Sequence, residues 1–284
     1  MNSIKILIFF ISLFSFFTAC KKSINHPKID KQLTINSKAP IVKKGFSQVS
    51  GLNMYYEIHG QGKPLVLIHG GGSTIETSFG RIIPLLSPSW QLICVELQAH
   101  GRTGDRNTPI SFKQDADDVA QLLQNLGFEK VAILGFSNGA NTALQMAIRH
   151  PDLCSKIIAG SPLLKRNGTL PQFWDFMKNG TFEQMPQAYK DAFLSVNPDN
   201  EKLHNMYEKC ANRMINFEEF SDEEILAIKV PVLLINGEND VATTEHVVAM
   251  SKLIPACQLE IVPGGHGAYI GEITTLSPET QEQT

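Results

Sequence analysis

The sequence predicts an α/β fold with a mostly parallel, doubly wound sheet and one inserted helical cap. Three observations support this prediction. Six short runs of leucine and β-branched residues are almost continuously apolar, which is typical of strands buried on both faces of a parallel sheet. Stretches with apolar residues at helical spacing alternate with these runs. One interval, residues 165–227, has helical spacing but no strand pattern, which indicates a cap inserted between the fourth and fifth strands.

The elements of the predicted core follow one another in regular order from Gly45 onward. Two strand-like segments on either side of Ser50-Gly51 predict a hairpin at its start. A helix is expected at residues 111–126, closed by Gly127, because glycine readily adopts the conformation that follows a helix. The core comprises residues 45–164 and 228–284, and residues 165–227 form the cap. The buried strands are expected at residues 64–68, 91–95, 131–134, 156–159, 232–235 and 258–262.

The N-terminal residues have the pattern of an export signal. Lys5 precedes an apolar run from Ile6 to Phe17, and Thr18-Ala19-Cys20 follows. The run is too short to span a bilayer comfortably, because a spanning helix needs roughly 20 apolar residues. The segment resembles a bacterial lipoprotein signal, although Phe17 stands where that family usually has leucine. An ordinary signal peptide and a retained signal anchor are the alternatives.

The lipoprotein resemblance implies a mature chain that begins at a lipidated Cys20, after removal of the signal peptide, residues 1–19. Residues 20–44 are rich in lysine and poor in large apolar residues, which predicts a linker between the lipid and the core. The protein is then expected to be exported and held by lipid on a membrane of the bacterial cell envelope. Whether the inner or the outer membrane holds it stays open.

Composition and charge narrow the range of partners. The formal net charge of −3 provides no strong field for nucleic acid, so no nucleic-acid partner is expected. The sequence contains no nucleotide-binding loop and no metal-ligand motif, so neither a metal nor another cofactor is expected. Disulfide pairing and the oligomeric state stay open. The cysteines after Cys20 form no CxxC pair, and we interpret them all as packing residues: Cys94, Cys154, Cys210 and Cys257.

The strongest functional signal is the pentapeptide Gly135-Phe136-Ser137-Asn138-Gly139, which lies between a predicted strand and an alanine-rich helix. A serine on such a sharp turn has a strained backbone, and its hydroxyl is lifted clear of the sheet. The residues two positions before and after it must be small, because strand and helix cross closely there. The pattern predicts Ser137 as a nucleophile at a helix N-terminus, where an anionic intermediate is favoured.

A glycine-rich motif, His69-Gly70-Gly71-Gly72-Ser73, follows the first buried strand. Together with the serine motif, it resembles the α/β-hydrolase fold in its esterase- and lipase-like group, and the resemblance covers residues from about 45 to 270. It implies that the backbone N–H groups of Gly71 and Asn138 form an oxyanion hole. The physical argument agrees, because glycine lets the main chain approach a substrate. His100, in the turn after the next strand, is expected to be structural.

A serine hydroxyl needs a base to remove its proton, and the base needs an acid to orient it. In this family the order along the chain is serine, acid and histidine. Asp240 follows the fifth buried strand and His266 follows the sixth, and α/β sheets place their sites at these carboxyl ends. Glu238 is the competing acid. Residues 270–284 are short and polar where the family usually has an amphipathic helix, so either that helix is abbreviated or the chain is truncated.

These residues predict a carboxylic ester hydrolase, or an enzyme that cleaves a related acyl bond, acting on a small-molecule acyl substrate. Ser137 would form an acyl-enzyme intermediate, which water then resolves. An acyltransferase or an aminopeptidase of the same fold is an alternative. Another alternative is a membrane-anchored binding protein that kept the scaffold without turnover. The sequence leaves the identity of the substrate open.

Overall fold

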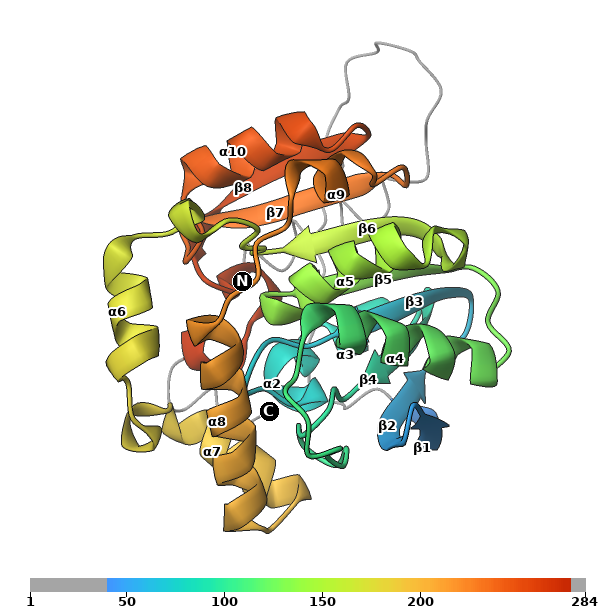
Figure 1. Cartoon of the computed structure of the whole chain (residues 1–284). Helices are drawn as coiled ribbons and strands as arrows, with labels where there is room; N and C mark the ends of the chain where they lie inside the picture. Colours follow the sequence, from blue (N-terminus) through green and yellow to red (C-terminus); the bar gives the residue numbers. More distant parts are fainter. Residues whose placement is uncertain (1–39, 277–284) are drawn as a thin grey trace, which may run out of the picture.

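A computed structural model describes residues 40–276 of the chain. The predicted signal peptide, Cys20 and almost all of the predicted linker lie outside these residues. None of the helices in the described range is long and apolar enough to cross a membrane. The predicted fold is confirmed: the strands form one sheet of eight, and helices cover both of its faces (Figure 1).

The sheet has a parallel part that carries the site and an antiparallel edge. Its strand order is β1-β2-β4-β3-β5-β6-β7-β8. β1, β2 and β4 pair in antiparallel fashion, and every pair from β4–β3 to β7–β8 is parallel. All six buried runs expected from the sequence lie within β3 to β8. The strands are β1 (Ile41–Val49), β2 (Leu52–His59), β3 (Lys63–Ile68), β4 (Trp90–Val95), β5 (Val131–Phe136), β6 (Cys154–Gly160), β7 (Val232–Asn239) and β8 (Cys257–Gly265).

Alternate side chains of the central strands enter two separate cores. In β3, Val66 and Ile68 pack in the larger core, whereas Leu65 and Leu67 pack in the smaller one on the opposite face. Both faces of the strand are therefore buried, which explains its uninterrupted apolar run. The larger core is covered by α4 (Phe112–Asn125), α5 (Asn138–Arg149), α9 (Asp222–Leu226) and α10 (Thr244–Leu253), and the smaller core by α2 (Ile75–Phe79) and α3 (Ile83–Leu86).

Between β6 and β7 the described chain forms helices and no strand, as expected for the cap. Three helices dominate it: α6 (Pro171–Asn179), α7 (Gln187–Val196) and α8 (Asn200–Ile215). Asp199 caps α8 by accepting hydrogen bonds from the amides of Glu201 and Lys202. Phe193, Leu203 and Met206 form a small core that holds α7 against α8. The helices lie over one end of the sheet, beside the carboxyl ends of its parallel strands (Figure 1).

The two ends of the described region refine the expectations from the sequence. β1 begins at Ile41, so three residues assigned to the linker, Ile41, Lys43 and Lys44, pair with β2 at the edge of the sheet. After β8 the chain makes two short 3₁₀ turns, η4 (Ala268–Ile270) and η5 (Ile273–Thr275), where the family usually has a helix. Tyr269 and Ile270 are buried in the smaller core, and they therefore supply packing close to His266.

Candidate active site

The serine motif forms the expected sharp turn between β5 and α5. Ser137 has φ 54° and ψ −121°, a conformation that residues other than glycine rarely adopt. A Cβ atom on Gly135 would lie 2.0 Å from the carbonyl oxygen of Gly139, and one on Gly139 would lie 2.1 Å from that of Ile68. Glycine is therefore required where β3, β5 and α5 converge. This close crossing fixes Ser137 at the N-terminus of α5.

His266 and Asp240 join Ser137 in one chain of hydrogen bonds. The Nε2 atom of His266 lies 3.0 Å from the Oγ atom of Ser137, and its Nδ1 atom lies 2.5 Å from the Oδ1 atom of Asp240. The side chain of Asp240 is fully buried, whereas that of His266 is 31% exposed. The structure thus brings together the three residues predicted as a triad. Glu238, the competing acid, is exposed to solvent.

Asp240 is held in its ionised form. Burial by itself would raise the pKa of its carboxyl group, but hydrogen bonds from His266, Ser161 and the Gly237 amide lower it, and the pKa ends below its ordinary value. Because the ionised carboxylate only accepts hydrogen bonds, the proton of the neutral imidazole must lie on Nδ1. The Nε2 atom of His266 is then free to accept the hydroxyl proton of Ser137.

Two residues that the sequence analysis missed complete the environment of Asp240. Ser161, with φ 55°, donates a hydrogen bond of 2.6 Å from its hydroxyl to the Oδ2 atom of Asp240. The Tyr269 hydroxyl lies 2.9 Å from the Ser161 hydroxyl and donates to it, because the single proton of Ser161 is already engaged. One signal was present in the sequence: Ser161 directly follows β6, at the same edge of the sheet as Ser137.

The two residues predicted to form the oxyanion hole lie next to each other. Asn138 is the first residue of α5, where helical amides have no partner within the helix. In the glycine-rich turn, the Gly70 amide donates to Ser78 and the Gly72 amide donates to His100. Between them, the Gly71 amide meets no acceptor in the described part of the chain. A Cβ atom on Gly71 would lie 2.3 Å from the side-chain nitrogen of Asn138, so the two residues are in close contact.

Two buried histidines form hydrogen bonds that keep the glycine-rich turn in place. His69 accepts from the Leu97 amide at Nε2, and His100 accepts from the Gly72 amide at Nε2. Burial lowers the pKa of His69 well below its usual value and lowers that of His100 to about 4. Both rings are therefore neutral acceptors, which agrees with a structural role for His100. The Sγ atom of Cys210 also lies 3.2 Å from Nε2 of His100, so this cysteine contacts the turn.

A cavity of about 450 Å³ opens above Ser137 and His266, between the core and the cap. Its size falls within the range of small-molecule sites. Gly71 and Asn138 line it together with Ser137 and His266. Most of the remaining wall comes from apolar and aromatic side chains of the cap, among them Phe173, Phe176, Met177, Met185, Tyr189 and Met214.

The family model for the alpha/beta hydrolase fold matches residues 63–214, which is more than half of the chain. The chain belongs to this α/β-hydrolase family. The match includes the serine motif and the glycine-rich turn, whereas Asp240 and His266 lie beyond it. Assignment of those two residues therefore depends on the geometry of the site.

Several relatives of this α/β-hydrolase are named as hydrolases, among them one from Metapseudomonas resinovorans and one from Bacillus subtilis. The 2-hydroxy-6-oxo-6-(2'-aminophenyl)hexa-2,4-dienoic acid hydrolase of Metapseudomonas resinovorans is 23% identical over 264 residues, covering 84% of this chain and 90% of that protein. The uncharacterized hydrolase YraK of Bacillus subtilis is 27% identical over 125 residues, but the match covers only 43% of this chain and 46% of YraK.

A solved structure shows the same fold. The 2-hydroxy-6-oxo-6-phenylhexa-2,4-dienoate hydrolase of Rhodococcus sp. strain RHA1 is similar with a TM-score of 0.69 at 18% identity, over 86% of this chain and 99% of that one.

Proposed function

We propose that this α/β-hydrolase is a serine hydrolase that cleaves a carboxylic ester or a related acyl bond of a small molecule. The observation that carries the proposal is the hydrogen-bonded chain from Ser137 through His266 to the buried Asp240. A nucleophile, a base and an orienting acid in hydrogen-bond reach are the arrangement that acyl transfer requires. The similarity to proteins named as hydrolases supports a hydrolytic reaction.

In the proposed mechanism, the Oγ atom of Ser137 attacks the carbonyl carbon of the substrate while Nε2 of His266 accepts its proton. The amides of Gly71 and Asn138 hold the oxyanion, and one such donor is typically worth ~10²–10³ in rate. The tetrahedral intermediate expels the alcohol, which receives the proton from His266 and leaves an acyl-Ser137 ester. Water then attacks this ester with His266 as base again, releasing the carboxylic acid and restoring Ser137.

A fluorophosphonate probe and an ester panel test the proposal together. The probe is expected to label the wild-type chain once, at Ser137, and mass spectrometry of the labelled peptide identifies the position. Hydrolysis of p-nitrophenyl esters is expected in the same preparation. A chain that is neither labelled nor active would be a binding protein. A labelled chain that transfers the acyl group to an added alcohol faster than to water would be an acyltransferase, and a preference for N-terminal peptide bonds would identify an aminopeptidase.

The cap is expected to determine which acyl chain fits the cavity. Met177, on α6, lines the cavity, so Met177→Trp should fill part of it. We expect kcat/KM for a decanoyl ester to fall at least tenfold, while that for the acetyl ester changes little, because pocket contacts to each lost methylene are worth ~1–3 kcal/mol. The measurement is kcat/KM over a p-nitrophenyl ester series from acetyl to decanoyl.

Lys178→Ala is the matched control for Met177→Trp, because Lys178 lies on the same helix, is exposed and does not line the cavity. In Lys178→Ala, the dependence of kcat/KM on the length of the ester's acyl chain should be the same as in the wild type. An equal loss on the acetyl ester in Met177→Trp would mean that this part of the cap supports the catalytic geometry instead.

We also propose that Cys20 is lipidated and that the lipid anchors the enzyme to a membrane of the bacterial cell envelope. Its support is the Thr18-Ala19-Cys20 sequence after the apolar run and the lysine-rich residues that follow. Each buried methylene contributes ~0.8 kcal/mol, and two or more acyl chains make anchoring stable without a spanning helix.

Cys20→Ser should therefore block processing or move the protein out of the membrane fraction of the producing bacterium. Cys257→Ser, which also removes one thiol, should stay with the membranes as the wild type does. Cell fractionation and the intact mass of the wild-type protein are the measurements. A wild-type mass that retains Met1, or a soluble wild-type protein, contradicts the proposed anchor.

A further inference from the structure

The wall of the cavity above Ser137 carries no charged side chain apart from the candidate base. None of the described residues that line it is an aspartate, a glutamate, a lysine or an arginine. His266 takes up a proton in the proposed reaction, but the ionised carboxylate of Asp240 lies 2.5 Å from its Nδ1 atom and balances that charge. The wall therefore offers a substrate no free charge.

The other ionisable groups of the wall are held in their neutral forms. Burial and the nearby Glu272 carboxyl group raise the pKa of Tyr189 well above its ordinary value. Burial also raises the pKa of the Tyr207 hydroxyl group and that of the Cys210 thiol. All three groups stay protonated at neutral pH, so none of them adds a charge to the wall.

Several polar groups on the wall already have partners in the protein. The side chain of Asn141 donates to the Leu163 carbonyl at 2.7 Å and accepts from the Leu163 amide at 3.2 Å. Ser161 donates to Asp240, and the Tyr207 hydroxyl donates to a backbone carbonyl at 2.9 Å. Three further lining residues are polar but uncharged: Asn138, Thr181 and Gln184. A substrate thus meets mostly apolar side chains.

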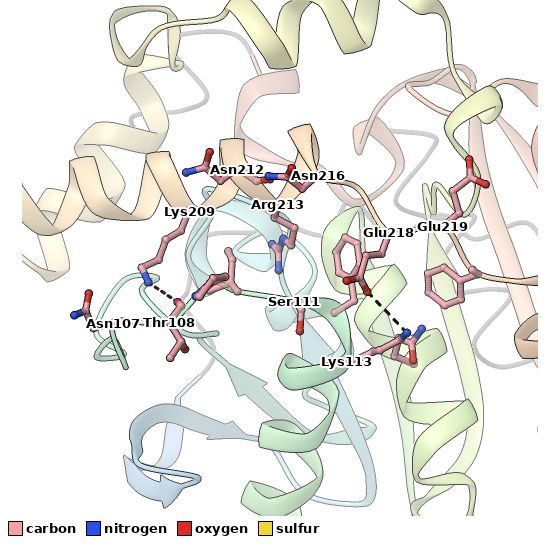
Figure 2. A pocket seen from close by; sticks show the side chains of 15 residues that line it. Asn107, Thr108, Ser111, Lys113, Lys209, Asn212, Arg213, Asn216, Glu218 and Glu219 are labelled. Atoms are coloured by element: carbon pink, nitrogen blue, oxygen red, sulfur yellow. Dashed lines mark hydrogen bonds and ion pairs between the residues drawn. The ribbon is translucent and has the colours of Figure 1, made fainter.

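No cation of the described cap lines this wall. On α8, Cys210 and Met214 line the cavity. Lys209 and Arg213 of the same helix line a separate pocket instead (Figure 2), where Arg213 forms an ion pair of 2.7 Å with a carboxylate of α4. Lys178, on α6, is exposed and does not line the cavity either. A negatively charged substrate group therefore has no cation to pair with in the cavity.

Such a wall distinguishes a carboxylate from an apolar group of similar size. A carboxylate that enters the cavity loses its hydration and finds no opposite charge, and the ionised Asp240 repels it. A hydrocarbon group, in contrast, gains free energy by leaving water for the apolar side chains of the cap. The cavity therefore favours a substrate that carries no charge.

We propose that this site takes uncharged esters of apolar carboxylic acids and rejects acyl chains that end in a carboxylate. The inference rests on the proposed function, because it requires that Ser137 attacks the ester within this cavity. It adds the class of substrate: the acyl group is a hydrocarbon chain or ring, and the monoesters of dicarboxylic acids are excluded.

Three methyl esters with the same acyl chain length test the inference in the wild-type protein: methyl hexanoate, monomethyl adipate and dimethyl adipate. They differ at the far end of the chain, which is a methyl group, a carboxylate or an uncharged ester. At pH 7 we expect kcat/KM for monomethyl adipate to lie about 100-fold or more below the other two values, because burying an unpaired charge is far less favourable than burying a neutral group. Acid release in a pH-stat is the measurement.

The fluorophosphonate probe separates failure of the inference from failure of the proposed function. If Ser137 is labelled but monomethyl adipate is cleaved as well as methyl hexanoate, or none of the three esters is cleaved, the substrate class is wrong and the nucleophile stands. If Ser137 is not labelled, the proposed function fails, and the inference that depends on it fails as well.

A cation placed on the wall should weaken this discrimination. Met177 and Met185 line the cavity from two separate segments, so Met177→Arg and Met185→Arg each add a charge there. In either variant, the ratio of kcat/KM for monomethyl adipate to kcat/KM for methyl hexanoate should rise about tenfold or more, because arginine pairs with carboxylates.

Met177→Gln is the matched control, because it adds a polar side chain of similar length without a charge. It should leave the ratio near its wild-type value. Unchanged ratios in both arginine variants, with folding confirmed by circular dichroism, would overturn the inference. If neither arginine variant folds, the three esters on the wild-type protein decide the question.

Discussion

Ser137→Ala is expected to fold as the wild-type protein does and to lose roughly 10⁶-fold in kcat toward any ester that the wild type cleaves. The remaining rate would come from the oxyanion hole and substrate binding alone. Folding should be unaffected, because alanine keeps the Cβ atom of serine and so meets the same strain at φ 54°. Initial rates with a p-nitrophenyl ester measure the loss, and circular dichroism measures the fold.

Ser161→Ala is the matched control for this substitution. Ser161 also has a positive φ angle and also lines the cavity above Ser137, but its hydroxyl donates to Asp240 instead of facing His266. Asp240 would keep its hydrogen bonds from the amides of Gly237 and Val241. We therefore expect kcat of Ser161→Ala to fall by only about 10–100-fold, as for the loss of one hydrogen bond to a charged group. Equal losses in the two variants, or an active Ser137→Ala, would show that Ser137 is not the nucleophile.

The sequence could predict the parallel part of the fold because burial leaves a direct trace in residue type. Leu65 to Ile68 are apolar without interruption, since alternate side chains enter cores on opposite faces of β3. The first residues of the edge strand β1 left no such trace. Ile41 to Lys44 are all exposed, so they resemble a linker in the sequence.

The candidate triad could be predicted because each of its residues follows a recognisable buried strand in the family's chain order. The interactions that support the candidate triad could not be predicted in this way. Ser161 reaches Asp240 across 79 positions of sequence, and the ion pair between Asp115 and Arg213 joins the core to the cap across 98 positions. Such pairs arise from how helices and strands pack in three dimensions, and no local pattern shows which residue pairs with which. The same limit hid a cavity of about 540 Å³ whose wall comes from residues 107–113, α5, α8 and residues 218–220 (Figure 2).

Asp240→Asn is expected to fold and to lose about 10⁴-fold in kcat/KM, the loss seen where an amide selects the wrong histidine tautomer. The carboxylate holds the imidazole proton on Nδ1 of His266, at 2.5 Å. If the amide nitrogen of asparagine takes that place, Nδ1 becomes the acceptor and Nε2 carries the proton. His266 then cannot accept a proton from Ser137.

The same substitution should lower stability. Oδ1 of Asp240 accepts from the Val241 amide and Oδ2 accepts from the Gly237 amide, so an amide nitrogen at either place faces a backbone N–H group. One donor left unsatisfied costs about 1–3 kcal/mol. In the folded protein the pKa of Asp240 is below its ordinary value. The stability advantage of the wild type over Asp240→Asn is therefore fully present above the unfolded pKa of about 3.9. Thermal unfolding should show the difference shrinking as the pH falls through the lower, folded pKa.

Glu238→Gln is the control that separates the two acids. Glu238 is exposed and lies two residues before Asp240, so its substitution should change kcat/KM by less than about threefold, as most surface changes away from a site do. The comparison uses kcat/KM with one p-nitrophenyl ester at pH 7 and at pH 9. The reverse ranking, with Glu238→Gln inactive and Asp240→Asn active at either pH, would make Glu238 the acid. The buried bond between Asp240 and His266 would then have no part in orienting the base.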